Sequence, residues 1–470
     1  MMHDLCLAVD IGTSSVKAGL IDSSGVLHAF GRSDICYPDD SYAALTPAHV
    51  YQSVREAIGQ LPGRLQAAVL AISGNGPSLI PVDLKGNDLG MVLLWLDGRE
   101  LRLEKTSSFF LPKLQWFRQH KPDLFGRTHR VLSCAEYVMF CFCGEMHTAS
   151  PSVDFDEYFW NQQDLAEYSL DAELFPDFAR PGALVGHLKD DVAAELGLSK
   201  GLSCAATGSD FLMSLLGTAT IKPGMVCDRA GSSEGINYCT SHPVKDGMLR
   251  TLPHIIPGLW NVSGILSSTG LLFEWFRRFT GMQDVSYLQM LQVISDARPP
   301  VPWFFPSLHR GASWEFRHGM FFGLGASHGT AEMGRAVVES IGFAVRETLE
   351  ILRKSVGPVE SVRACGGQTR NPVWNQMKAD IIGVPLEIPE IPEAELLGGA
   401  VCGFACLAGQ GSLPEIAESI VRIASVYEPC QAQHKEYSLE YENYSAAYQA
   451  VREAIATVPD STFQTCRSFV

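Results

Sequence analysis

A strand–turn–strand pattern that occurs twice is the feature that most constrains how this chain can fold. The first copy occupies residues 5–21, where two apolar stretches flank a polar, glycine-containing turn at 10–15. The second copy occupies residues 224–239, about two hundred residues later, with its small-residue turn at 230–235. Each copy predicts a pair of antiparallel strands. Together they predict two domains built on one plan, although a match this short is weak evidence of a repeat when taken alone.

The length of the chain also favours two domains. A single hydrophobic core rarely grows beyond roughly 250–300 residues, and this chain has 470. We expect the domains to occupy residues 3–228 and 229–458. A third strand at 26–30 would extend the first pair into an antiparallel meander. Strands alternate with helical patterns through the rest of the sequence, which is typical of the α/β class.

Local patterns predict several further elements. Residues 331–354 carry apolar side chains at helical spacing. Asn371 followed by Pro372 is a favourable helix start, and we expect that helix to end near residue 382. The other expected elements are strands at 66–73 and 359–364 and helices at 135–142 and 396–407.

Composition excludes some partners. The formal net charge is −16, and so acidic a surface repels phosphate backbones, so we expect no nucleic-acid partner. We find no signal-peptide pattern and no apolar stretch long enough to span a membrane. The 13 cysteines suit a reducing cytoplasm. Cys141, Cys143 and His147 could indicate zinc, but no second ligand pair has structural-zinc spacing, so we favour buried thiols.

The first polar turn, D-I-G-T-S-S-V-K from Asp10 onward, is a candidate phosphate-binding loop. A tight turn exposes successive backbone N–H groups, and Gly12 permits close approach of a ligand. Thr13 and Ser14 add hydroxyl donors, and Lys17 adds a cation. Asp10 could bind Mg²⁺ directly or through water. An ordinary hairpin turn explains the same residues about equally well.

Three later segments add to this pattern. Asp210 follows T-G-S and precedes an apolar helical stretch, so it could act as a base for a hydroxyl, although a helix N-cap is the simpler role for a lone Asp there. Residues 231–233 form a second small-residue turn that could bind phosphate. Gly366 and Gly367 would let a flat adenine ring lie against the backbone.

The whole chain resembles the FGGY carbohydrate kinases, most closely the xylulokinase branch. The resemblance covers residues from about 5 to about 411. Its motifs gain specificity from their order along the chain. They are D-I-G-T-S-S-V-K at 10–17, L-W-L-D-G-R at 94–99, G-S-D at 208–210, G-G-Q-T-R-N at 366–371, W-N-Q-M-K-A-D-I at 374–381 and G-G-A at 398–400.

The resemblance implies a two-domain actin-like ATPase (ribonuclease H-like) fold with a central interdomain cleft. It implies ATP-dependent phosphorylation of a small sugar, such as a pentulose, or a polyol, with Asp210 as general base. Implied ATP ligands are Gly12, Thr13, Ser14, Lys17, Gly231, Ser232, Ser233, Gly366, Gly367, Gln368 and Asn371. Implied sugar ligands are Asn75, Gly76, Pro77, Trp95, Asp97, Arg99 and Asp210, and implied Mg²⁺ ligands are Asp10 and Asp210. We expect a cytoplasmic enzyme, which could be a homodimer.

Three segments depart from the family pattern. Xylulokinases usually have S-G-Q-M-H-G where this chain has S-G-N-G-P-S at 73–78, so Gly76 and Pro77 offer little hydrogen bonding and the sugar could differ. Glu234 follows the second turn, where it would weaken ATP binding if it pointed inward and would be harmless if it pointed outward. Residues 309–313 lack the family's Gly-Glu-Arg-x-Pro run.

Two alternatives to an active sugar kinase stay open. The altered loops would suit a catalytically impaired relative that binds nucleotide and acts as a sensor or regulatory protein. An actin-like or chaperone-type ATPase acting on proteins would share the fold, but Trp95, Asp97 and Arg99 in the expected sugar region argue against it.

Overall fold

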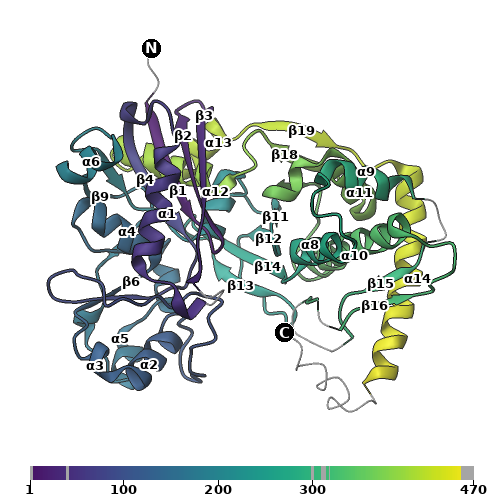
Figure 1. Cartoon of the computed structure of the whole chain (residues 1–470), viewed down its shortest axis with the longest axis horizontal. Coiled ribbons are helices and arrows are strands. Elements are labelled where there is room, and N and C mark those ends of the chain that lie inside the picture. Colours follow the sequence, from purple (N-terminus) through teal and green to yellow (C-terminus); the bar gives the residue numbers. More distant parts are fainter. Residues whose placement is uncertain (1–3, 39–41, 298–300, 309–313, 317, 457–470) are drawn as a thin grey trace. The chain divides into compact units, whose positions relative to one another are not determined.

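The computed structural model describes residues 4–38, 42–297, 301–308, 314–316 and 318–456, which form two compact units (Figure 1). Unit 1 consists of Met1–Ile221, Pro253–Leu259 and Glu393–Arg422. Unit 2 consists of Lys222–Leu252, Trp260–Pro392 and Ile423–Val470. Each unit is built around one large mixed sheet, so the α/β class is confirmed.

The unit 1 sheet has the strand order β3-β2-β1-β4-β10-β9. β1, β2 and β3 form the antiparallel meander expected from the sequence, and β4 and β10 add in parallel. β9 closes the far edge in the antiparallel direction. The bounds are β1 Leu5–Ile11, β2 Ser15–Asp22, β3 Leu27–Asp34, β4 Ala67–Gly74, β9 Leu184–His187 and β10 Ser203–Ala205, with short pairs β5 Ile80–Val82, β6 Arg130–Leu132, β7 Thr148–Ala149 and β8 Phe178–Ala179.

Side-chain alternation along β1 divides the unit 1 sheet between two helical layers. Leu7 and Val9 belong to the core cluster that contains the apolar side chains of α1 and α4. Cys6 and Ala8 lie on the opposite face, against α12. The helices of unit 1 are α1 Pro47–Gly59, α2 Leu111–His120, α3 Pro122–Phe125, α4 Cys134–Cys143, α5 Gln162–Glu167, α6 Asp190–Leu196, α7 Asp210–Gly217, α12 Ala394–Leu407 and α13 Leu413–Ile420.

The unit 2 sheet repeats the plan of unit 1. Its order is β13-β14-β12-β11-β17-β18-β19, in which β11 pairs antiparallel with β12 and parallel with β17, as β1 pairs with β2 and β4. The same correspondence continues outward to β18 and its antiparallel edge strand β19. The bounds are β11 Val226–Ala230, β12 Glu234–Thr240, β13 Arg250–Pro253, β14 Trp260–Leu266, β17 Val362–Cys365, β18 Leu386–Pro389 and β19 Ile423–Tyr427, with a separate pair β15 Trp303–Phe305 and β16 Met320–Phe322.

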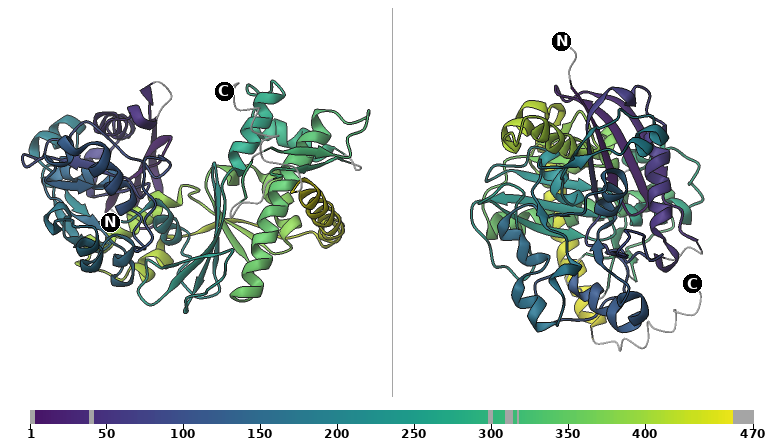
Figure 2. Two further views of the ribbon diagram at one scale, coloured as in Figure 1. Left: turned by 90° about the horizontal axis from the view of Figure 1, so that it is seen from below. Right: turned by 90° about the vertical axis from the view of Figure 1, so that its left-hand side faces the viewer.

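A long buried helix, α10, organises the helical part of unit 2. Figure 2 shows it beside the sheet, and its side chains Val345 and Leu349 belong to the core cluster of β11, β12 and β14. Earlier residues of the same helix, such as Val337, pack instead on α8 and α9. The helices of unit 2 are α8 Thr269–Phe279, α9 Tyr287–Asp296, α10 Thr330–Ser355, α11 Pro372–Ile382 and α14 Gln431–Ile455.

Most elements expected from local patterns are confirmed within one or two residues at each end. Helix α11 has the expected bounds, and the side chain of its N-cap Asn371 accepts hydrogen bonds from two backbone N–H groups. The third strand is longer than expected, Leu27–Asp34, and it begins one residue later because the carboxylate of Asp22 accepts N–H bonds from Ser24 and Val26 and extends the preceding turn. In the part of the chain that is described, no helix combines the length and apolar character needed to cross a membrane.

Candidate active site

A cluster of charged side chains lies at one end of the unit 1 sheet. Asp10 is near the carboxyl end of β1, and Lys17 lies directly opposite it on β2. Asp210 is the first residue of α7, and Glu395 lies in the first turn of α12. The carboxyl group of Asp10 is buried and accepts a hydrogen bond of 3.1 Å from Ser73. The two aspartates singled out from the sequence therefore belong to one group, together with Lys17 and with Glu395, which was not expected.

Asp210 is not the N-cap of α7, a role that the sequence had left open. Ser209 occupies the N-cap position and forms a parallel bridge with Gly74 at the end of β4. Asp210 begins the helix, and its Oδ1 accepts the backbone N–H of Phe211 at 2.7 Å. The bridge between Ser209 and the end of β4 thus fixes the position of the Asp210 side chain.

Close packing between α7 and α12 brings Glu395 to the same group. A Cβ atom added at Gly398 would lie 2.0 Å from the carbonyl oxygen of Met213, and one at Gly217 would lie 1.9 Å from that of Ala394. The helices can approach this closely only because neither glycine has a side chain. The hydroxyl of Ser214 on α7 donates to Oε1 of Glu395 at 3.0 Å.

The group carries an excess of negative charge. Burial, assisted by repulsion from Glu395 and Asp210, raises the pKa of Asp10 to about 7. Attraction to Lys17 and the hydrogen bond from Ser73 act in the opposite direction but do not cancel the rise. A cation or several donors beside these carboxylates would stabilise their ionised forms.

The turn after β1 is held by side chains from two other segments. The indole N–H of Trp95 donates to the hydroxyl of Thr13 at 2.9 Å, and Tyr37 donates to the Thr13 carbonyl. The carbonyl of Ser14 accepts the backbone N–H of Ile35 at 2.9 Å. Gly12 uses its own N–H to close the turn on Ser15 at 3.0 Å. Trp95, expected to touch sugar, is therefore connected to the first turn, which is expected to bind phosphate.

A pocket opens at the carboxyl ends of β4 and β10 in unit 1. Its wall includes Asn75 and Gly76 from the loop expected to bind sugar, but Pro77 is not among its lining residues. Gly208 and Ser209, which immediately precede Asp210, form another part of the wall. Two residues of the pocket wall therefore directly precede the candidate base in the sequence.

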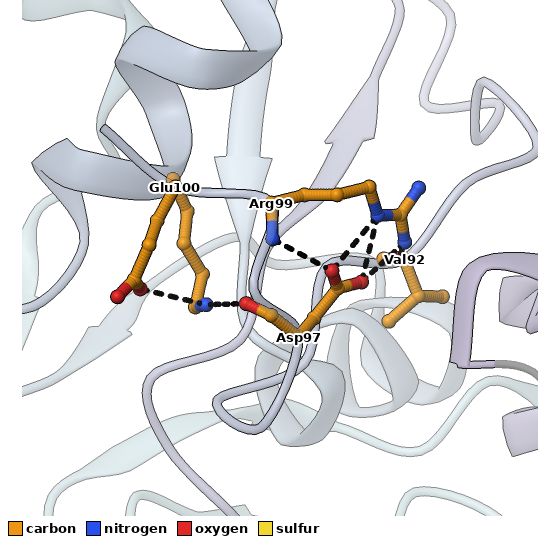
Figure 3. A network of polar contacts seen from close by, with 5 residues as sticks. Val92, Asp97, Arg99 and Glu100 are labelled. Atoms are coloured by element: carbon orange, nitrogen blue, oxygen red, sulfur yellow. Dashed lines mark hydrogen bonds and ion pairs between the residues drawn. The ribbon is translucent and has the colours of Figure 1, made fainter. Parts of the chain in front are cut away.

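Asp97 and Arg99, also expected to bind sugar, form an ion pair with each other. Figure 3 shows that the backbone N–H and the guanidinium of Arg99 both bond to the Asp97 carboxylate, with Nε to Oδ2 at 2.8 Å. Burial alone would raise the pKa of Asp97, but the bonds from Arg99 outweigh it and lower the pKa. Lys113, which is buried, donates to the Asp97 carbonyl at 2.7 Å. This network orders the backbone that follows Trp95.

In unit 2, the two segments expected to bind nucleotide contact each other. Gly231, Ser232 and Ser233 form the turn between β11 and β12. The side chain of Gln368 donates to the Gly231 carbonyl at 2.8 Å and accepts from the indole of Trp374 at 3.2 Å. Gln368 therefore connects the second turn to the segment 366–371.

The two glycines of that segment differ in their surroundings. Gly366 has a φ of +94°, and a Cβ atom there would lie 2.5 Å from the Ala230 carbonyl oxygen, so the backbone itself requires glycine. A Cβ atom at Gly367 would meet nothing within 4 Å, which leaves open space beside that backbone. Asn371 uses Oδ1 to cap α11, while its Nδ2 is buried and has no partner among the described residues.

Glu234 is buried beneath the second turn. Its carboxylate pairs with the ammonium group of Lys378, which also contacts Asp228 at 2.8 Å. All three side chains are buried, and the triad has two carboxylates for one ammonium group. Neither orientation considered from the sequence describes this arrangement, because Glu234 points into the core and shares one ammonium group with Asp228 there.

The remaining sequence expectations concern metals and one loop. Among the described residues, no group of three or more His, Cys, Asp or Glu side chains is placed to hold a metal ion, and this includes Cys141, Cys143 and His147. Residues 309–313, whose family motif is missing, lie outside the described residues.

Sequence reasoning did not identify Glu395, Lys378 or His147 as parts of these sites. Glu395 and Lys378 lie far along the chain from their partners, and nothing in their local sequence links them. A lysine in an otherwise buried helical pattern was the one available signal for Lys378, because a buried lysine needs a carboxylate partner.

Comparison with known protein families identifies the class of this chain. Residues 5–217 match the N-terminal domain, and residues 229–407 the C-terminal domain, of the FGGY family of carbohydrate kinases. The chain therefore belongs to the FGGY family and is a sugar kinase.

Individual relatives cover nearly the whole chain. A xylulose kinase of Staphylococcus epidermidis is 22% identical over 97% of this chain and 99% of its own length. An autoinducer-2 kinase of Yersinia enterocolitica is 25% identical over 98% of this chain and 97% of its own. A crystal structure described as a xyloylose kinase from Brucella ovis has a TM-score of 0.82 at 23% identity, covering 96% of this chain and 100% of that chain. The fold is the actin-like ATPase fold of this family.

Proposed function

We propose that this chain transfers the γ-phosphoryl group of ATP to a hydroxyl of a small ketose, with Asp210 as the general base. The observation that carries the proposal is the position of Asp210 at the start of α7, beside a pocket and close to Asp10 and Lys17. Phosphoryl transfer to an alcohol needs a carboxylate that can accept the hydroxyl proton, and positive charge near the phosphates. Asp210 and Lys17 are suited to these two tasks.

The donor set also suits Mg²⁺, the usual partner of ATP. Magnesium in such sites is commonly held by one or two carboxylates, with phosphate oxygens and water completing the octahedron, so no cage of protein ligands is needed. Burial, with repulsion from Glu395 and Asp210, raises the pKa of Asp10, and a divalent cation beside it would offset that rise. Asp10 and Asp210 would hold the ion, and its chemistry when bound would be to neutralise charge on the phosphates.

A pentulose is the acceptor that we favour. Kinases named for xylulose are among the relatives that match over nearly the whole chain. The loop containing Asn75 and Gly76 lines the pocket beside the candidate base. An autoinducer-2 kinase matches at similar identity, so the acceptor panel must extend beyond simple pentuloses.

Replacement of the proposed base tests the mechanism. We expect Asp210→Asn to lower kcat by about 10²- to 10⁴-fold and to change ATP affinity little, because the amide cannot accept the proton. Asp191→Asn is the matched control, since Asp191 lies in the first turn of α6 and accepts the next backbone N–H at 2.9 Å, as Asp210 does in α7. Steady-state kinetics and nucleotide binding measure both variants. A wild-type rate in Asp210→Asn would remove Asp210 from this role.

A catalytically impaired relative that senses a sugar is the alternative, and one assay separates it from a kinase. The chain is incubated with ATP, Mg²⁺ and a library of ketoses and polyols, and products are examined for a mass gain of one phosphate. We expect at least one sugar phosphate. Nucleotide binding without any product across the library would favour the sensor.

A further inference from the structure

Two buried histidines of unit 1 differ in how their ring nitrogens are satisfied. His254 contacts the Thr220 carbonyl through Nε2 at 3.0 Å and accepts the Ile256 N–H through Nδ1 at 3.0 Å. His147 is only 8% exposed, yet its Nδ1 has no hydrogen-bond partner among the described residues. Buried polar atoms are nearly always paired, so an exception requires an explanation such as a ligand.

His147 lies in the wall of the pocket beside the candidate base. Asn75 lies in the same wall, is 3% exposed, and has an Oδ1 atom that also lacks a partner in the described part of the chain. Two residues that carry unsatisfied polar atoms, from segments more than seventy residues apart, thus line one small pocket.

The rest of the wall is apolar or uncharged except for Glu136. Phe110 and Phe159 stack on each other with ring centroids 4.9 Å apart, and both line the pocket. Both oxygens of Glu136 already accept backbone N–H bonds, from Ser133 at 2.7 Å and from Ala149 at 2.8 Å. No lysine or arginine lies among the residues that line the pocket.

We propose that His147 and Asn75 bind hydroxyl groups of the sugar and that this pocket selects an uncharged sugar over a sugar acid. The inference rests on the proposed function and specifies its acceptor. Gly76 offers no polar side-chain atom, so hydrogen bonds to a sugar must come from other residues of the wall, among which are His147 and Asn75. Hydroxyl groups suit both partners, because a hydroxyl donates and accepts.

The charges of the residues that line the pocket favour an uncharged sugar over a sugar acid. Burial lowers the pKa of His147 to about 4, so the ring is neutral at pH 7 and offers no positive charge. A carboxylate on the ligand would lose water beside Glu136 without gaining a cation. Sugar hydroxyls would instead satisfy Nδ1 of His147 and Oδ1 of Asn75, and the sugar's carbon skeleton would contact the two phenylalanines.

Four variants test the proposal through binding as well as turnover. His147→Phe keeps a flat ring and removes both nitrogens, and His147→Asn restores a polar atom near the position of Nδ1. Asn75→Ala provides an independent test should His147→Phe fail to fold. Ser152→Ala is the matched control, because Ser152 is a buried side chain near His147 in the sequence whose hydroxyl is also unpaired, but it does not line the pocket. The probes are the ketopentose of the library that binds most tightly and xylonate, a five-carbon sugar acid.

We expect His147→Phe and Asn75→Ala each to raise Kd and KM for the ketopentose by about 10-fold or more, with kcat within about 3-fold of wild type. His147→Asn should recover most of that loss, and Ser152→Ala should match wild type. Xylonate should bind wild type at least about 10-fold more weakly than the ketopentose. Calorimetric titration measures binding, and circular dichroism verifies folding.

Several outcomes would overturn the inference: unchanged ketopentose binding in His147→Phe or, if that variant does not fold, in Asn75→Ala; equal binding of xylonate; or no binding of any library sugar by wild type. Ketopentose binding without phosphate transfer would contradict the proposed function alone, because the Kd values of the variants would still decide the role of His147.

Discussion

At the scale of single residues, Glu234 illustrates how a contact that is distant in the sequence changes the meaning of a side chain. A carboxylate directly after a phosphate-binding turn suggests repulsion of the ligand. In the structure it is buried and shares Lys378 with Asp228. Lys378 is 144 residues from Glu234, and no local pattern relates them. By contrast, the cap that Asn371 forms on α11 was predictable, because it depends only on the next three residues.

We expect opposite effects on stability from substitution of the lysine and from substitution of a carboxylate in this triad. Lys378→Met leaves two carboxylates buried without a counter-charge and should lower the free energy of unfolding by about 3–5 kcal/mol. Glu234→Gln removes the surplus negative charge and should leave that free energy unchanged or raise it. Urea denaturation at pH 8 measures both. Equal destabilisation by the two variants would contradict the charge argument.

The pH dependence of the Glu234→Gln difference is a second check on the same expectation. Burial raises the pKa of Glu234 to about 7, with Lys378 opposing the rise and Asp228 adding to it, whereas the unfolded chain keeps the ordinary value of 4.5. The folded protein therefore binds a proton between about pH 7 and 4.5 that the unfolded chain does not. Wild type should gain stability relative to Glu234→Gln as the pH falls through this range.

At the scale of helices and strands, the local sequence predicted which elements form better than it predicted which elements pack together. Helix α10 and strand β1 were predictable because their apolar spacing is continuous. The pairing of α7 with α12 was not, because it depends on Gly217 and Gly398, which lie in separate segments and act only when the helices meet. This pairing positions Glu395 beside Ser214, so an unpredicted contact shapes the candidate active site.

Substitution of two neighbouring glycines of α12 tests how much the site depends on that contact. We expect Gly398→Ala to lower the free energy of unfolding by roughly 1–3 kcal/mol and to reduce kcat, because its Cβ would lie 2.0 Å from the Met213 carbonyl. Gly399→Ala is the control in the same helix. Its Cβ would meet Ala8 at 3.6 Å, an ordinary contact, and alanine favours the helix by about 1 kcal/mol.

Thermal unfolding and steady-state kinetics of the two variants give the comparison. Gly399→Ala should be as stable as wild type or more stable, with an unchanged rate. If Gly398→Ala behaves in the same way, the helices can separate without consequence and the contact does not position the site.

At the scale of the whole molecule, the repeated sheet plan was visible in two short sequence patterns. The sequence patterns did not show which segments of the chain belong to which unit. Residues 393–422 return to unit 1 after most of unit 2 is complete, and α12 covers the face of its sheet formed by Cys6 and Ala8. Nothing in the local sequence of α12 indicates which sheet it covers, because small apolar side chains suit either.

This chain path predicts that residues 1–228 do not fold cooperatively alone. Such a fragment contains β1 and β4 but exposes the apolar face that α12 covers, and burial of that face is a main source of its stability. A tethered fragment, in which a short Gly/Ser linker joins residue 221 to residues 393–422, should unfold in one transition. The linker can be short because Gly217 lies against Ala394.

Circular dichroism during urea titration measures both fragments. Both lack residues 253–259, so apart from the linker and residues 222–228 they differ only in residues 393–422. A Gly398→Ala version of the tethered fragment should have a lower denaturation midpoint, because α12 could no longer seat fully on α7. Cooperative unfolding of residues 1–228 alone, at the midpoint of the tethered fragment, would show that the returning helix is dispensable for this unit. The amino-terminal segment would then specify its own sheet without the layer that α12 provides.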